Sequence, residues 1–463
     1  MRNILLLSVS LIVVSCTVGP NYVEPKIYED KQISEALKLN GTDLKVSNVW
    51  YEQFEDKNLN TLINYALLNS PDILSSISKL RQARTLVSIN KTDFLPFLNG
   101  GAEYDYVKPS KNIGLATNTD YFQIGFDASW ELDIWGKGKR LNEQTLAEFE
   151  QALYSLRNVK SIIVAEVATT YFNLKTTHEN LRIAKQNLAV QQDIFDMVSE
   201  KYKAGLADSS SYNQAKYILE TTKALIPSLE NNALAQKNAL AVLCGTLPDR
   251  LPVIISETDI NPLNKVYKYN LKTLYDLPAS IIRSRPDVKM AERNLAAQNA
   301  VIGQAVAEMY PNISISAMLG YQSKKLSNIF SSDSQAYSYK PALSLPLFNW
   351  NKLSNNVSLQ KQIKEENYQQ YRQTILKAVE ELNNAIIAIQ QELKTNQSQR
   401  NAVYSMQKVL NSMREKYDYG LIEFSDLLQT QQNLLKSQTD LANSSGNILK
   451  NIVAYYKATG GGY

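Results

Sequence analysis

Two stretches of the chain carry a hydrophobic pattern with a seven-residue period, which predicts unusually long helices. In residues 138–203 the pattern runs without a proline or glycine after residue 138. Its clearest positions are Leu174, Leu181, Leu188, Phe195 and Tyr202. Residues 353–418 keep the period with more polar members, which are Ile389, Asn396, Val403, Leu410 and Tyr417. At about 1.5 Å per residue each helix would extend roughly 100 Å, several times the width of a small domain.

Each long run ends in a similar turn. The sequences are KYKAGLADSS from Lys201 and KYDYGLIEFS from Lys416. Gly205 and Gly420 can adopt the left-handed conformation that ends a helix, and a second amphipathic run follows each turn. The pattern therefore predicts two long helical hairpins, over residues 138–245 and 353–458.

The separation in sequence between the two turn glycines, Gly205 and Gly420, recurs at many other positions. We call this difference in residue number the repeat offset. The pairs that it relates include Pro96 with Pro311, Trp135 with Trp350, Glu166 with Glu381 and Gly245 with Gly460. The offset holds from about residue 70 to the end of the chain without a shift. We interpret it as an internal tandem duplication.

Alternating apolar and polar residues predict one β-hairpin in each half, over residues 98–132 and 313–347. Polar loops, residues 108–120 and 323–336, connect the strands. The apolar face of one strand consists of Phe122, Ile124, Phe126, Ala128, Trp130 and Leu132. The opposite face of the first hairpin carries Glu103, Asp105, Asp127 and Glu131. Such strands suit a membrane barrel with a wet lumen, and a soluble sandwich is the alternative. Four strands cannot enclose a lumen, so we expect the chain to form oligomers.

Residues 1–15 have the features of a secretory signal peptide: Arg2, an apolar run from Ile4 to Val14, and then Ser15 before Cys16. The tetrad that ends at Cys16 looks like a bacterial lipobox, in which this cysteine becomes lipidated. An ordinary signal peptide with an incidental cysteine is the alternative.

The remaining chain divides into four predicted parts. Residues 16–55 form an extended N-terminal segment, 56–245 the first repeat, 246–285 a connector interrupted by prolines, and 286–463 the second repeat. Together they predict an α+β fold.

Composition excludes several classes of protein. The chain is 44% hydrophobic. Beyond the N-terminus, however, no apolar run approaches the roughly 18 residues that a membrane-spanning helix needs, which excludes a helical membrane protein. A net charge of +4 with mixed signs gives no support for nucleic acid binding.

The single histidine, His178, matches no metal motif. We expect no enzymatic activity and no cofactor or metal site. If Cys16 is lipidated, Cys244 has no disulfide partner; we expect it to be buried, with a reactive thiol as the alternative.

Several strings occur together and in order: CTVGPNYVEP, VWYEQFEDKNLNTLI, WELDIWGKGKR, NALAVLCG and LSLPLFNW. Through them the mature chain resembles the TolC-like outer-membrane factors, specifically the NodT-type efflux lipoproteins. The resemblance implies a homotrimer with an outer-membrane β-barrel, four strands from each chain, continued by a periplasmic α-helical barrel. It also implies an exit duct for small molecules, coupled through a periplasmic adaptor (membrane fusion protein) to an inner-membrane RND-type pump.

The resemblance further implies that the hairpin turns dock the adaptor. The matching positions are Lys201, Tyr202, Gly205, Leu206 and Ser210 in the first turn, and Lys416, Tyr417, Gly420, Leu421 and Ser425 in the second. Ordinary helix capping by glycine and leucine is the alternative.

A periplasmic gate is also implied, because the family narrows this end with acids six and nine residues after the second-turn glycine. Here the sixth residue after Gly420 is Asp426, the ninth is Gln429, and the first-repeat position that corresponds to Asp426 is Ser211. Tyr417 matches a family residue that ties neighbouring helices in the closed state. The alternative for Asp426 is a favourable charge at a helix N-terminus.

The alternative functions are a passive outer-membrane porin and a scaffold that spans the periplasm without conducting. A porin has no use for helices of this length, and a scaffold has no use for acids along one face of a barrel.

Overall fold

The computed structural model describes residues 17–41, 47, 49–92, 95–110, 112, 119–256 and 274–461. The predicted signal peptide, Cys16 and residues 257–273 of the predicted connector lie outside them. The chain forms two compact units. The first comprises Met1–Pro25, Lys79–Leu153 and Met290–Arg372, and the second comprises Lys26–Ser78, Tyr154–Lys289 and Gln373–Tyr463.

Helices make up most of the described chain. The long ones are α5 (Lys137–Lys203), α6 (Ser209–Leu243), α10 (Trp350–Asp418) and α11 (Phe424–Ala458), with α4 (Pro71–Thr92) and α9 (Pro286–Ala307) next in length. The shorter ones are α2 (Asp30–Leu37), η1 (Trp50–Phe54), α3 (Lys57–Asn69), η3 (Pro248–Arg250), α8 (Ser280–Ser284), η6 (Leu326–Asn328) and η7 (Ser332–Ser334). None of the described helices is both long and apolar enough to cross a membrane.

The lengths of these helices recur along the chain. Helices α4 and α9 have 22 residues each, and the repeat offset separates their first residues, Pro71 and Pro286. Helices α6 and α11 have 35 residues each, and the same offset separates Ser209 from Phe424. The spacing seen in the sequence therefore extends to the helices themselves.

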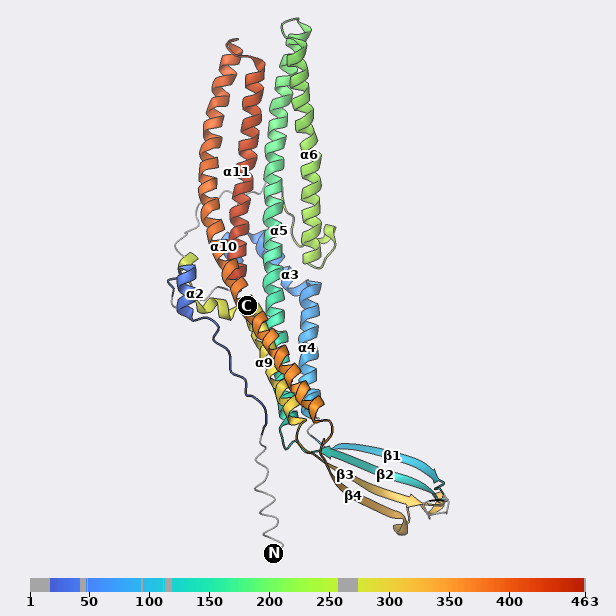
Figure 1. Cartoon of the computed structure of the whole chain (residues 1–463). Helices are drawn as coiled ribbons and strands as arrows, with labels where there is room; N and C mark the ends of the chain where they lie inside the picture. Colours follow the sequence, from blue (N-terminus) through green and yellow to red (C-terminus); the bar gives the residue numbers. More distant parts are fainter. Residues whose placement is uncertain are drawn as a thin grey trace. The chain divides into compact units, whose positions relative to one another are not determined.

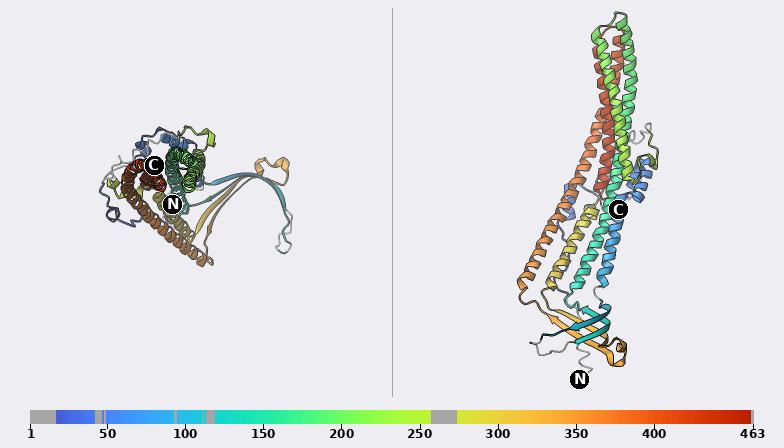
Figure 2. Two further views of the ribbon diagram at one scale, coloured as in Figure 1. Left: turned by 90° about the horizontal axis from the view of Figure 1, so that it is seen from above. Right: turned by 90° about the vertical axis from the view of Figure 1, so that its right-hand side faces the viewer.

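The first unit contains one antiparallel sheet of four strands in the order β1-β2-β3-β4. The strands are β1 (Phe97–Val107), β2 (Thr119–Glu131), β3 (Asn312–Ser323) and β4 (Gln335–Ser344). They follow one another in a single curved layer (Figure 2). Four strands per chain are what the alternating pattern predicts, and the tertiary structure adds that β2 and β3, from different halves of the chain, lie side by side.

The two faces of this sheet differ in polarity. Cross-strand partners share a face, and the rows Leu98–Ala128–Ala317–Tyr339 and Ala102–Ile124–Tyr321 carry apolar and aromatic side chains. The intervening rows on the other face carry glycines and polar groups, including Gln123, whose amide oxygen accepts a hydrogen bond from Gln322. The acids Glu103, Asp105, Asp127 and Glu131 all belong to this polar face.

In the second unit, α5 and α6 form one antiparallel hairpin and α10 and α11 form another (Figure 1). Aromatic packing attaches η1 to them. Trp50 of η1 stacks on Tyr456 of α11 with ring centroids 5.0 Å apart, and Phe54 contacts Phe172 of α5 at 4.8 Å. Arg285 is buried and donates hydrogen bonds to the Glu381 carboxylate and to the carbonyl of Ala458, which ties the segment before α9 to α10 and α11.

Cys244 follows α6 and is buried, as expected. Its thiol donates to the carbonyl of Leu62 at 3.7 Å. Burial raises the pKa of this thiol to about 11, so it stays protonated at neutral pH, and since the thiolate is the nucleophile, this argues against a reactive cysteine. His178 is also buried, within α5.

Candidate functional site at the ends of the helical hairpins

The two hairpin turns have the same backbone geometry. Gly205 and Gly420 adopt φ of +74° and +69°. The amide of Leu206 donates to the carbonyl of Lys201 at 2.8 Å, and the amide of Leu421 donates to that of Lys416 at 2.9 Å. These bonds, together with those from each glycine amide, form the Schellman arrangement that closes a helix C-terminus.

The leucines at these turns project into open space. Leu206 is 79% exposed and Leu421 is 71% exposed. In an ordinary Schellman cap, the residue after the glycine often packs back onto the last helical turn. At this degree of exposure the two leucines gain little from such packing, so each turn leaves an apolar side chain at its surface.

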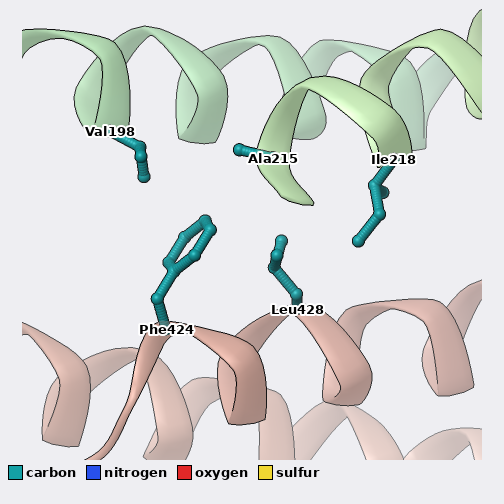
Figure 3. Close-up of a cluster of buried hydrophobic side chains, with 5 residues drawn as sticks. All are labelled: Val198, Ala215, Ile218, Phe424 and Leu428. Carbon is teal, nitrogen blue, oxygen red and sulfur yellow. The ribbon is translucent and has the colours of Figure 1, made fainter. Parts of the chain in front are cut away.

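Just below the turns, an apolar cluster joins the two hairpins. It consists of Val198 from α5, Ala215 and Ile218 from α6, and Phe424 and Leu428 from α11 (Figure 3). Tyr417 of α10 packs against it, with its ring centroid 5.6 Å from that of Phe424. All four helices therefore contribute to one small core at this end.

The turn tyrosines and Lys201 have distinct partners. Lys201 lies over the ring of Tyr417, with its ammonium 4.6 Å from the ring centroid, and is also 3.5 Å from the tyrosine hydroxyl. Because these residues belong to α5 and α10, this cation–π contact joins the two hairpins. Tyr202 stacks on Tyr212 at 5.0 Å and so stays within the first hairpin. Lys416, by contrast, is exposed.

The second helix of each hairpin begins differently. Asp208 caps α6, since its carboxylate accepts a hydrogen bond from the backbone amide of Ser211 at 2.7 Å. This bond holds the pKa of Asp208 below its ordinary value. At the start of α11 the capping position belongs to Glu423, whose side chain makes no capping bond. Ser210 and Ser425 are exposed, and Ser425 donates to Glu423 at 3.4 Å.

Asp426 lies in the first turn of α11 and is exposed. Its backbone carbonyl accepts a bond from Thr430, whereas no ion pair engages its carboxylate among the residues that the structure describes. Gln429, one turn further on, is exposed and donates to Asn433 at 3.1 Å. The structure therefore leaves the carboxylate of Asp426 available to a group outside the chain.

The sequence pattern predicts Lys201 and Tyr417 as separate site residues and does not pair them, and it does not predict the apolar cluster. The sequence does hold a sign of this cluster, because apolar residues recur at helical spacing at the start of the second helix of each hairpin. Phe424 and Leu428, four residues apart, are an example. That pattern marks a buried face without saying which helix covers it.

A second site holds the chain just after Cys16. Arg140, at the start of α5, is only 2% exposed. Its guanidinium donates to the carbonyls of Val18 and Gly19, both at 3.1 Å, and to the side chain of Asn21 at 2.9 Å. The same segment is bonded through Tyr22, whose hydroxyl donates to Glu292 of α9 at 2.6 Å. Residues 18–22 are thus fixed to the first unit.

Comparison with known proteins agrees with this architecture. The family model described as outer membrane efflux protein matches residues 62–246 and again residues 277–461. The cation efflux system protein CusC of Escherichia coli O6:H1 is 27% identical over 459 residues, which cover 98% of this chain and 97% of CusC. Nodulation protein T of Rhizobium leguminosarum bv. viciae is 26% identical, with 98% of this chain and 92% of that protein covered. The solved outer-membrane channel OprN has a TM-score of 0.86 and 26% identity, with 96% of this chain and 99% of OprN covered.

Proposed function

Because the chain belongs to the outer membrane efflux protein family, we propose that it is the outer-membrane exit duct of an efflux system. The observation that carries this proposal is the family match over both halves of the chain. The sheet supports it, since one face is apolar and the other polar, as a barrel between lipid and a wet lumen requires.

The duct is a homotrimer. The described residues of one chain form four strands, too few to enclose a lumen. Three chains supply twelve strands for the outer-membrane barrel, and their long helices continue as a periplasmic α-helical barrel. A tandem duplication would explain why helices of equal length recur at the repeat offset. The chain then divides into a first repeat (residues 56–245), a connector (246–285) and a second repeat (286–463).

A lipid anchor at Cys16 adds membrane affinity to that of the barrel. Its support is the firm attachment of the next residues: Arg140, Asn299 and Glu292 all bind the segment from Val18 to Tyr22. An acyl chain on Cys16 would therefore enter the membrane at a fixed place on the first unit.

The hairpin turns dock a periplasmic adaptor, which connects the duct to an inner-membrane pump of the RND type. The exposed leucines support this assignment, because Leu206 and Leu421 are apolar and capping does not bury them. A few apolar side chains surrounded by polar ones are typical of the centre of a protein interface.

The same end of the helices forms the gate. Within each chain, Lys201 and Tyr417 hold the two hairpins together, while Asp426 offers its carboxylate to neighbouring chains. The closed state therefore depends on contacts at the helix ends, and engagement of the adaptor opens it.

Single-channel conductance in planar bilayers tests the duct and its gate together. We expect wild type to be mostly closed, and Asp426→Ala to conduct several-fold more, because the substitution removes the carboxylate that binds neighbouring chains or bridging cations. Glu415→Ala is the matched control: it removes another exposed acid, near the end of α10, and should behave as wild type.

Each other result has a definite meaning. Large, steady conductance in all three proteins would support a permanently open channel and contradict the proposed gate. An absence of conductance in every protein would contradict the exit duct.

A further inference from the structure

The end of the sheet that lies away from the helices carries a groove. Strands β1 and β3 follow helices α4 and α9, while β2 and β4 lead into α5 and α10. All four strands are therefore joined to helices at the same end of the sheet. The β3–β4 loop, residues 324–334, lies at the opposite end, where it is drawn in gold (Figure 2).

The groove lies on the apolar face of the sheet. Its floor consists of side chains from two rows of cross-strand partners, Ile124 with Tyr321, and Phe126 with Leu319 and Tyr337. Its volume is about 480 Å³, within the roughly 300–1,000 Å³ that small-molecule sites have. Leu319 is 66% exposed and Tyr337 is 84% exposed, so the chain itself leaves this apolar floor open.

The β3–β4 loop supplies one wall of the groove. Phe330 approaches the ring of Tyr321 edge-on, with the ring centroids 5.6 Å apart, and is itself 70% exposed. Contacts within the loop hold this wall in place: Ile329 is buried, and the hydroxyl of Ser334 donates to the carbonyl of Asn328 at 2.8 Å. Because the wall is already folded, a ligand does not have to order it on binding.

Two lysines lie next to the groove. Lys324 and Lys325 directly follow β3, which supplies part of the floor, and both are exposed. The backbone amide of Lys325 donates to the hydroxyl of Ser323 at 3.2 Å, which fixes the chain at this point. Neither lysine forms an ion pair within the part of the chain that the structure describes, and Asp333 is the single acid in the loop sequence. The loop beside the groove therefore carries a net positive charge.

We propose that the groove binds an acyl chain of a phosphorylated lipid of the outer leaflet, with the lipid phosphate at Lys324 and Lys325. This inference rests on the proposed duct, in which the apolar face of the sheet meets lipid. Since the helices of the duct are periplasmic, the opposite end of the sheet lies at the outer leaflet. Tyr321 and Tyr337 suit the boundary between acyl chain and headgroup, because a phenol is apolar along its ring and polar at its hydroxyl.

This site differs from the general contact between a barrel and its membrane. An apolar strand face by itself accepts any acyl chain. Here the Phe330 wall comes from a loop, and the same loop begins with the two lysines. One folded segment thus offers an apolar contact and two cations to a single lipid, which predicts a preference for lipids that carry phosphate.

Lipid titration of the purified full-length protein tests the site. The probes are lipid A and the same lipid A after removal of its phosphates, and native mass spectrometry from detergent counts the lipids bound to each chain. Lys324→Gln together with Lys325→Gln removes both charges, and Phe330→Ala removes the wall. The matched control is Lys361→Gln together with Lys377→Gln, which neutralises two exposed lysines of α10.

We expect wild type and the α10 control to bind one lipid A per chain, more tightly than the dephosphorylated form. A lysine near a charged lipid contributes roughly fivefold in affinity. The double substitution at Lys324 and Lys325 should therefore weaken binding of lipid A about 30-fold and leave that of the dephosphorylated lipid unchanged. Phe330→Ala should weaken the binding of both lipids, because both use the apolar groove.

Three results would overturn the site. They are a wild type without preference for lipid A over its dephosphorylated form, equal affinity for lipid A in wild type and in the Lys324 and Lys325 variant, and unchanged binding of both lipids by Phe330→Ala. None of them affects the exit duct as long as wild type conducts in planar bilayers. A wild type that prefers lipid A as expected but does not conduct would contradict the duct and support the lipid site.

Discussion

Arg140 illustrates how one buried side chain organises a segment that has no secondary structure of its own. Residues 18–21 form neither helix nor strand, and their carbonyls need donors once they lie against the protein. Arg140 supplies these from a position where it is almost inaccessible to water. The close approach of Arg140 explains the glycine at position 303, because a Cβ there would lie 2.7 Å from the arginine side chain. The fork of guanidinium donors suits several acceptors at once.

Arg140→Ala should release this segment. The substitution leaves the carbonyls of Val18 and Gly19 without their donor, at a cost of about 3 kcal/mol, or roughly a hundredfold faster local opening. Hydrogen exchange at the amide of Val18, which donates to the carbonyl of Trp135, measures this opening. Arg157→Ala, an exposed arginine on the same helix, is the control, and equal exchange in both variants would contradict the role of Arg140.

At the scale of elements, the helical hairpins depend on glycines that permit an abrupt reversal of the chain. At Gly205 and Gly420 a Cβ would meet nothing within 4 Å, so space is not the reason for glycine at either turn. The reason is the positive φ, which costs most other residues about 1 kcal/mol or more. Both hairpins therefore have a turn set by backbone conformation.

Gly420→Ala should consequently weaken the second turn without a steric clash. We expect a loss of about 1 kcal/mol in local stability, seen as faster hydrogen exchange at the amide of Leu421, which donates to Lys416. Gly420→Asn is the matched variant, because asparagine tolerates the left-handed conformation better. If alanine and asparagine accelerate exchange equally, backbone conformation is not the cause.

At the scale of the whole molecule, the exposed edges of the sheet indicate that one chain is an incomplete unit. The chain covers Trp135 but leaves Trp350 half exposed, although the two occupy equivalent positions in the two repeats. Lys340 likewise lies on an open edge next to other polar residues. In the proposed trimer, a closed ring of copies would give each of these groups the partner that its counterpart already has.

In the proposed trimer β4 of one chain would lie beside β1 of the next, so a charge exchange between Lys340 of β4 and Asp105 of β1 in the neighbouring chain tests the assembly. Lys340→Asp should lower the temperature at which the trimer dissociates in detergent, because like charges directly opposite are unfavourable by about 0.2–1 kcal/mol per contact. Combining it with Asp105→Lys should restore most of the loss. Lys325→Asp makes the same charge change outside the two edge strands, β1 and β4. A double variant no more stable than the sum of its single substitutions would show that the two residues do not interact.

Much of this protein follows from the sequence by itself. Long unbroken periodicity predicts long helices, Gly205 and Gly420 predict their ends, and alternation predicts four strands with one apolar face. These features are local: each depends on residues close together in the chain and on backbone conformations that few residue types adopt. The strings that resemble outer-membrane factors also identified the family from sequence alone.

Only the tertiary structure decided which distant groups meet. In the tertiary structure β2 lies beside β3, and Lys201 of one hairpin lies over Tyr417 of the other. Arg140 donates to carbonyls far earlier in the chain. Lysine and arginine have long side chains that reach many partners, and a periodic pattern marks a buried face without naming what covers it. Contacts of this kind follow from how the elements pack, because that packing decides which polar groups lose water and must find a partner inside the protein.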